Sequence, residues 1–116
     1  MFKSFKSESR IMYMYSRDNI YIFTIFRGNR GLEHMSIIKS KDPEDALERF
    51  SRESVFREIR YIVIDESIHI NQSFLREFLE KNKLIMINKT DYEELNELMS
   101  REILDKIISF IQKHNM

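Results

Sequence analysis

The sequence predicts an α/β fold, one domain with a mixed five-stranded sheet in the element order β-β-β-α-β-α-β-α and helices packed on the sheet faces. Three observations predict it. The first third alternates β-branched and aromatic runs with turn residues, which is typical of antiparallel strands. Residues 61–65 and 84–87 are apolar runs that favour central strands covered on both faces. Helical spacing of apolar residues separates and follows these two runs.

The N-terminal third predicts a three-stranded antiparallel meander. Residues 10–15 and 20–26 are strand-like, and residues 16–19 between them are turn formers, which indicates a hairpin. Residues 27–31 hold both glycines of the chain and indicate a second turn. The third strand, residues 32–39, has a weaker alternation that suits a sheet edge. We expect the residues before Arg10 to form a flexible N-terminal segment of the single 116-residue domain.

Three helices are predicted after the meander. Asp42 can cap the first helix and Pro43 has the φ angle of the first helical position, so we expect a helix from Pro43 to about Ser54. Residues 74–82 have the spacing of a second amphipathic helix. A capping box at residues 90–93 opens a third helix of about six turns. Its apolar positions are Leu95, Leu98, Met99, Ile103, Ile107, Phe110 and Ile111.

The apolar positions of this last helix spread wider than a single contact seam requires. Two interpretations stay open: part of the helix faces a second copy of the chain, or the helix is a long core helix with an apolar flank. The edge strand over residues 32–39 offers a second route to self-association, because exposed edges accept partner strands.

Composition excludes several classes of function. The chain has no cysteine, which excludes disulfides, thiolate nucleophiles, iron–sulfur clusters and the common zinc modules, and fits a reducing cytoplasm. We therefore expect a cytoplasmic protein. No apolar run approaches membrane-spanning length, and no phosphate-binding Gly-x-x-x-x-Gly-Lys loop is present, so we expect neither a membrane nor a nucleotide cofactor as partner. The abundance of Ile, Lys, Asn and Met suggests an AT-rich coding source, such as some viruses and mobile elements.

Charge is balanced overall but is distributed unevenly. Residues 1–41 contain eight basic and three acidic residues, a net charge of +5, which permits a surface that faces a polyanion. The candidate nucleic-acid contacts are Arg17, Arg27, Arg30 and Lys39. Nearby aromatic residues could stack on single-stranded bases or could instead belong to the core. These residues are Tyr13, Tyr15, Tyr21, Phe23 and Phe26.

Asp65 and Glu66 are the strongest candidates for chemistry. They follow a buried strand, and open α/β sheets place their ligand crevices at the carboxyl ends of strands. The two carboxylates could bind a metal ion, with Asp65 as the principal ligand. They could also serve as a polar end to the strand or as a helix cap.

The element order resembles the ribonuclease H-like fold, which ribonucleases H, junction resolvases and the middle domain of peptide-release factors share. In catalytic members, carboxylates hold two magnesium ions for phosphodiester hydrolysis. The resemblance implies that Asp65 matches the acid at the end of the fourth strand, that Glu44 or Glu48 matches the helix acid, and that Asp91 matches the last acid. The first predicted strand contains no carboxylate. Residues 61–98 also resemble the opening of PIN-type nucleases.

These observations predict a small non-catalytic binding or assembly module, homodimeric and engaging a protein or nucleic-acid partner without a cofactor. One alternative is a Mg²⁺-dependent nuclease of ribonuclease H-like type that uses Asp65, Glu66, Glu48 and Asp91. A second alternative is a single-stranded nucleic-acid binder that uses the basic meander. We expect no enzymatic activity, because a two-metal site that lacks its first-strand acid lacks a central ligand.

Overall fold

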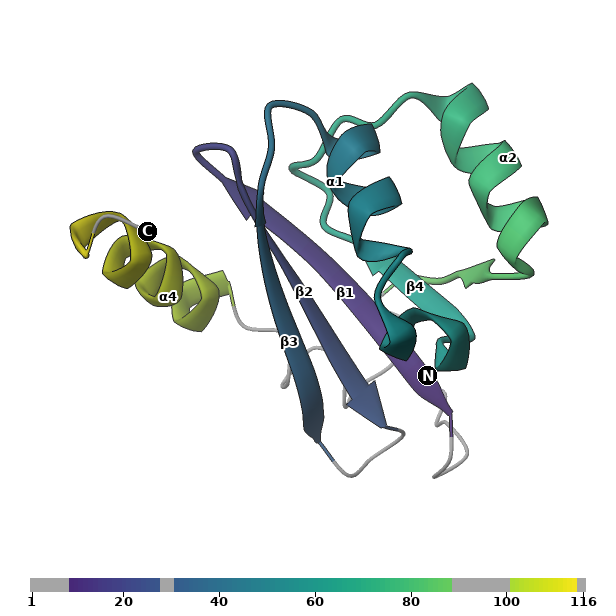
Figure 1. Ribbon diagram of the computed structural model, residues 1–116, viewed down its shortest axis with the longest axis horizontal. Helices are drawn as coiled ribbons and strands as arrows, with labels where there is room; N and C mark the ends of the chain where they lie inside the picture. Colours follow the sequence, from purple (N-terminus) through teal and green to yellow (C-terminus); the bar gives the residue numbers. More distant parts are fainter. Residues whose placement is uncertain (1–8, 28–30, 89–100, 115–116) are drawn as a thin grey trace.

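A computed structural model describes residues 9–27, 31–88 and 101–114. Within these ranges the chain forms strands and helices in the predicted order (Figure 1). The strands are β1 (Arg10–Arg17), β2 (Ile20–Arg27), β3 (Leu32–Lys39), β4 (Tyr61–Ile64) and β5 (Ile85–Met86). The helices are α1 (Pro43–Phe50), the short 3₁₀ helix η1 (Ser54–Glu58), α2 (Gln72–Asn82) and α4 (Arg101–Lys113). The predicted capping box at residues 90–93 lies outside the described residues.

The five strands form one mixed sheet in the order β3-β2-β1-β4-β5. β1 pairs antiparallel with β2, and β2 pairs antiparallel with β3. β1 pairs parallel with β4, with Met12 opposite Ile62, and β4 pairs parallel with β5. The predicted α/β class with a mixed five-stranded sheet is therefore confirmed. β1 and β4 lie at its centre, which is where the residues of the candidate site are placed.

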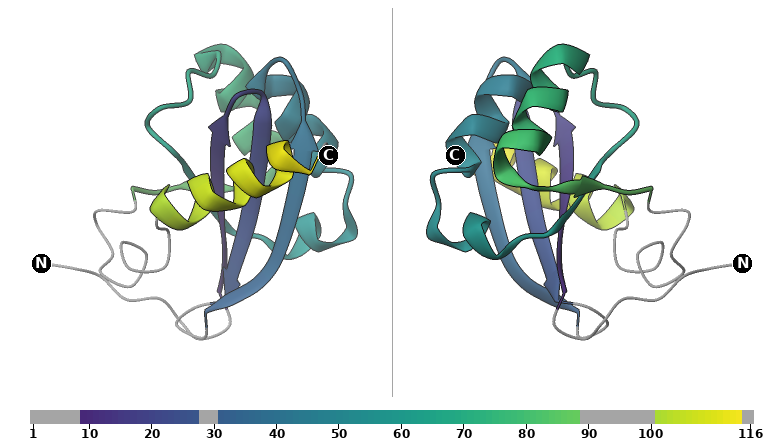
Figure 2. Two further views of the ribbon diagram at one scale, coloured as in Figure 1. Left: turned by 90° about the vertical axis from the view of Figure 1, so that its left-hand side faces the viewer. Right: turned by 90° about the vertical axis from the view of Figure 1, so that its right-hand side faces the viewer.

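Helices cover both faces of the sheet. α1 and α2 lie on one face and α4 crosses the other (Figures 1 and 2). Even-numbered residues of β1, such as Met12, contribute to the cluster that includes Leu47 and Phe50 of α1. Odd-numbered residues, such as Tyr13, contribute to the cluster that includes Ile108 of α4. Among the described helices, none is long and apolar enough to cross a membrane.

The first hairpin turns more tightly than the sequence predicted. β1 continues to Arg17 and β2 begins at Ile20, so only Asp18 and Asn19 form the turn. Their φ angles are 55° and 64°. Short polar side chains tolerate this left-handed region, and two such residues match the twist of paired strands. The predicted four-residue turn was therefore two residues too long.

α1 begins where the sequence predicted and ends earlier. The Asp42 carboxylate accepts a hydrogen bond from the backbone N–H of Asp45, and Pro43 is the first helical residue. The helix ends at Phe50 instead of near Ser54. The chain then turns into η1, which places the Phe56 ring edge-on against Phe50 at a centroid distance of 6.0 Å. Burial of Phe56 accompanies the early end of the helix.

One prediction about the C-terminal half was wrong. β5 is a two-residue edge strand, and Ile85 and Met86 are 44% and 46% exposed, so this run is not a central strand. On α4, Leu104 is buried, whereas Ile103 and Phe110, two of the apolar positions whose role the sequence left open, are 58% and 60% exposed. An apolar run alone does not reveal whether another element covers it.

Candidate functional site

The candidate site lies at the carboxyl ends of the two central strands, β1 and β4. β1 and β4 are neighbours in the sheet, and the chain runs outward from them in opposite directions. It passes from β1 through β2 to β3 on one side and from β4 to β5 on the other. Open sheets bind ligands where the strand order diverges in this way. Asp65 follows β4 directly, and its backbone N–H donates to the carbonyl oxygen of Met14 at 2.9 Å. This bond extends the parallel pairing and fixes the carboxylate on the face that α4 covers.

The Asp65 carboxylate is fully buried and is hydrogen-bonded through both oxygens. Oδ1 accepts from the hydroxyl of Tyr13 and from Nε of Arg101 at 2.9 Å. Oδ2 accepts from the backbone N–H of Ser67 at 3.1 Å and from its hydroxyl at 2.5 Å. A buried carboxylate is stable only with such compensation, so the four donors account for an ionised Asp65 in the interior.

These contacts shift the pKa values of the groups involved. Burial by itself would raise the pKa of Asp65, but the hydrogen bonds from Ser67, Tyr13 and Arg101 outweigh burial and hold it below its usual range. Burial and the adjacent carboxylate raise the pKa of Tyr13. Hydrogen bonds to Glu66 and Asp65 raise the pKa of Arg101. At neutral pH the site therefore consists of a carboxylate, a neutral phenol and a guanidinium cation.

Arg101 bridges both candidate acids. Its Nη2 donates to Oε1 of Glu66 at 2.7 Å, while Nε holds Asp65. The arginine and the two acids line a hollow of about 320 Å³ whose other lining residues are Tyr13, Val63, Ile64 and Asn88. A guanidinium thus occupies the cationic position beside both carboxylates. A metal ion that approached Asp65 would have to displace Arg101 from this position.

The structure does not bring the other predicted nuclease acids to Asp65. Glu48 is exposed on α1, which packs on the opposite face of the sheet. Glu44 accepts a hydrogen bond from the backbone N–H of Asn71 at 3.1 Å, at the start of α2. Asp91 lies outside the described residues. In the part of the chain that the structure describes, no three His, Asp or Glu side chains form a metal-binding group.

A second polar cluster joins β1 to α4. The Tyr15 hydroxyl donates to Oδ1 of Asp105 at 2.6 Å, and Arg17 forms an ion pair with the same carboxylate at 3.3 Å. Arg17 also donates to the Ser109 hydroxyl at 2.8 Å. Burial and the Asp105 carboxylate raise the pKa of Tyr15 to about 12. The cluster anchors α4 across the carboxyl end of β1.

The predicted nucleic-acid contacts are dispersed. Arg17 belongs to the β1–α4 cluster, and Arg27 forms an ion pair with Glu33 at 3.5 Å. Lys39 is exposed at the end of β3, and Arg30 lies outside the described residues. The aromatic residues proposed for stacking are all core residues and are at most 6% exposed, namely Tyr13, Tyr15, Tyr21, Phe23 and Phe26.

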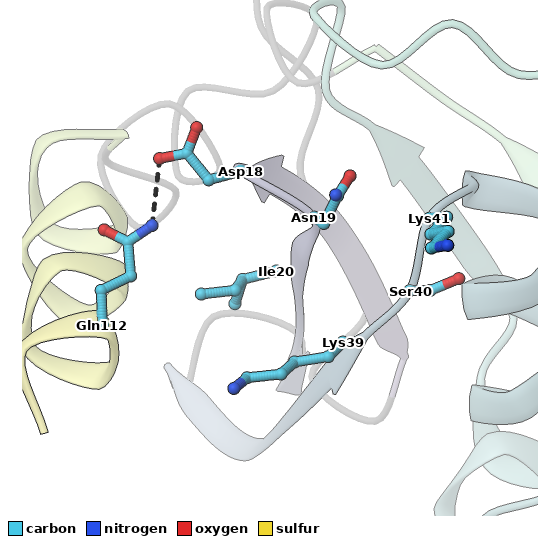
Figure 3. Close-up of a pocket in the computed structure, with 7 residues that line it drawn as sticks. All are labelled: Asp18, Asn19, Ile20, Lys39, Ser40, Lys41 and Gln112. Carbon is cyan, nitrogen blue, oxygen red and sulfur yellow. Dashed lines mark hydrogen bonds between the residues drawn. The ribbon is translucent and has the colours of Figure 1, made fainter. Parts of the chain in front are cut away.

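Lys39 lines a hollow of about 530 Å³ between the first hairpin, the β3–α1 connection and α4 (Figure 3). Figure 3 shows the side chains of Asp18 and Gln112 closing one side through a hydrogen bond of 3.0 Å. Lys41 supplies a second cation, but acidic Asp18 lines the same hollow and α1 begins beside it with Asp42, Glu44 and Asp45. The charges around the hollow are therefore mixed.

Three residues of the Asp65 site were not predicted to lie beside Asp65: Tyr13, Ser67 and Arg101. A Tyr on a buried central strand needs a partner for its hydroxyl, and this requirement was a usable signal for Tyr13. Ser67 lies two residues after Asp65, a spacing at which a carboxylate often accepts from the backbone. No local pattern indicates Arg101, because it lies 36 residues from Asp65.

No protein-family model matches the sequence, and a search of curated proteins finds no match.

Proposed function

We propose that this chain is a small binding or assembly module that forms a homodimer and engages a macromolecular partner without catalysing a reaction. The observation that carries the proposal is the burial and hydrogen bonding of the Asp65 carboxylate. The most plausible catalytic carboxylate is buried and fully hydrogen-bonded, and it links β1, β4 and α4. These contacts hold two strands and a helix together, which is a structural role.

The chemistry of the Asp65 site supports this interpretation. A metal-dependent hydrolase needs carboxylate oxygens that are open to the metal ion and to substrate. In this site Tyr13 stands on the central strand beside Asp65, and Arg101 supplies the positive charge that balances both Asp65 and Glu66. The element order and the pairing of β1 with β4 are compatible with a ribonuclease H-like sheet that serves as a platform.

Exposed apolar side chains supply the surface for assembly. Ile103 and Phe110 are exposed on α4, and Leu32 and Ile37 are exposed on β3. Ile37 lies opposite Ile22 and Leu32 lies opposite Phe26, so both point to the sheet face that α4 covers. Exposed apolar side chains on the same side of the sheet favour a protein interface more than scattered ones do.

Sedimentation velocity over a range of protein concentrations tests the assembly part of the proposal. We expect a concentration-dependent shift from a 14.2 kDa monomer to a species of twice that mass. A monomer at every concentration up to the millimolar range would contradict the homodimer.

A cleavage assay tests the absence of catalysis. We expect no Mg²⁺- or Mn²⁺-dependent cleavage of single-stranded, duplex or branched DNA and RNA. Cleavage that disappears in Asp65→Asn, but persists in the matched control Glu48→Gln on the opposite face, would replace this proposal with a nuclease.

A further inference from the structure

The free edge of β3 is a continuous strand edge along one side of the molecule. β3 pairs only with β2 among the described strands, whereas the opposite edge strand, β5, has two residues. Eight residues of antiparallel strand extend about 27 Å at roughly 3.4 Å per residue. The described chain measures 39 × 29 × 25 Å, so β3 runs along most of one side. In Figure 1, β3 lies at the front of the sheet, with α4 to one side and α1 to the other.

The hydrogen-bond pattern identifies which backbone groups of β3 point outward. The N–H of Ser40 donates to the carbonyl oxygen of Asn19 at 3.0 Å, so this pair is a hydrogen-bonded pair of the β2–β3 ladder. Bonded and non-bonded pairs alternate in an antiparallel ladder. The N–H and C=O groups of Met35 and Ile37 and the N–H of Lys39 therefore point away from β2, and none of the other described strands pairs with them. The C=O of Lys39 points the same way but accepts a hydrogen bond from Nη1 of Arg49 at 2.6 Å.

We propose that two copies of the chain pair through their β3 edges, antiparallel and centred on Ser36, to form a continuous ten-stranded sheet. This inference rests on the proposed homodimer and specifies its interface. Only registers that oppose outward-pointing residues can form the ladder, and centring on Ser36 opposes Met35 of one copy to Ile37 of the other. Both side chains lie on the α4 face. The Met35–Ile37 pair occurs twice, once on each side of the two-fold axis, and each occurrence buries apolar surface.

Exposed apolar side chains favour the same register. The regular ladder of β3 ends at the bulge opposite Ile25 and Phe26, where Glu33 is ion-paired with Arg10 and Arg27 of its own chain, so the pairing depends on Met35 and Ile37. Leu32, 54% exposed, lies beyond the bulge, at the end of β3 that the antiparallel arrangement brings near Lys39 and Ser40 of the other copy. α4 crosses the sheet (Figure 2) and reaches the Lys39 end of β3, because Gln112 and Lys39 line the same hollow. Phe110 on α4 is 60% exposed. Dimerisation brings Leu32 to the end of the partner sheet where Phe110 is exposed.

A cysteine cross-link tests the register directly, because the natural chain has no cysteine. In this register the two Ser36 residues form a non-hydrogen-bonded pair, with Cα atoms about 4.5 Å apart, a separation that a disulfide can span. We expect Ser36→Cys to form a disulfide-linked dimer under mild oxidation. The control Met86→Cys, on the opposite sheet edge, should stay monomeric on a non-reducing gel. Cross-linking of Met86→Cys alone would overturn the inference.

A matched pair of charge substitutions tests the same edge without a covalent bond. Ile37 on β3 and Ile85 on β5 are 43% and 44% exposed, so a lysine at either position is compatible with the folded monomer. We expect Ile37→Lys to raise the dimer dissociation constant at least tenfold and Ile85→Lys to leave it unchanged, with the same circular dichroism spectra for both.

Sedimentation separates failure of this inference from failure of the proposed function. A dimer that persists unchanged in Ile37→Lys, together with no cross-link through Ser36→Cys, would place the interface elsewhere and leave the homodimer intact. A natural chain that stays monomeric would contradict both the homodimer and the β3 pairing.

Discussion

The two faces of the sheet are held to their helices by different kinds of contact. On the α1–α2 face the core is aromatic: Phe23 stacks on Phe50 with ring centroids 4.4 Å apart, and Phe56 lies edge-on between Phe50 and Phe78. On the α4 face, apolar packing is supplemented by polar contacts at the carboxyl ends of the strands. These contacts are Tyr13–Asp65–Arg101, Tyr15–Asp105, Arg17–Ser109 and Asp18–Gln112.

This difference indicates which contacts determine the position of each helix on the sheet. Aromatic stacking contributes a large apolar area that pH hardly affects. Hydrogen bonds and ion pairs fix the orientation of a helix on the sheet, and their strength depends on the ionisation of the groups. We therefore expect the position of α4 on the sheet to depend on Asp65 and Asp105, while the α1–α2 face is insensitive to the same changes.

The largest effect should follow from a substitution on the aromatic face. Phe50→Ala removes a fully buried ring that contacts both Phe23 and Phe56, and we expect a loss of about 3–5 kcal/mol in the free energy of unfolding. Urea denaturation followed by circular dichroism measures this loss. The matched control Phe110→Ala, at a 60% exposed ring, should cost far less. Equal losses would contradict the description of this face as the principal core.

A smaller effect should follow from removal of the Asp65 charge on the α4 face. Asp65→Asn keeps the size of the side chain but turns an amide donor toward the donors of Ser67 or Arg101, and we expect a loss of about 2–3 kcal/mol. The value is below that for a fully enclosed ion pair, because the Arg101 side chain is 41% exposed and can be solvated. Denaturant titration at pH 7 measures it, with Glu66→Gln at an exposed partner as the control.

The pH dependence of stability sharpens the same comparison. The pKa of Asp65 is lowered in the folded state, so its contribution is present above the unfolded value of about 3.9 and is lost as pH falls through the folded value. We expect the natural chain to lose stability below about pH 4, and Asp65→Asn to lose less over the same interval. Parallel pH profiles for the two proteins would show that Asp65 is not a source of the acid sensitivity.

The smallest effect should come from the second polar cluster. Tyr15→Phe removes the hydroxyl that donates to Asp105 at 2.6 Å, and we expect a loss of about 1 kcal/mol. Because the ring itself remains in the core, the change isolates the hydrogen bond. Thermal unfolding measures it, and a double-mutant cycle with Asp105→Asn should show that the two losses are not additive. Additive losses would mean that the two side chains do not act as a pair.

Much of the fold was readable from local patterns. Alternation of apolar residues indicated the strands of the meander, Asp42 and Pro43 indicated the start of α1, and the apolar run before Asp65 indicated a central strand that ends in a carboxylate. Each of these signals acts within a few residues, where backbone geometry and capping chemistry are decided. The sequence by itself therefore determined the elements, their order and the place of the most informative acid.

Tertiary structure alone decided what that acid does and which surfaces are free. Asp65 meets Tyr13 and Arg101, which lie 52 and 36 residues away, and such pairings depend on how strands cross and helices dock. The exposure of Ile85 and Phe110 likewise depends on which neighbours cover them. An apolar pattern states that a side chain can be buried, whereas the packing of distant elements decides whether it is buried or remains available to a partner.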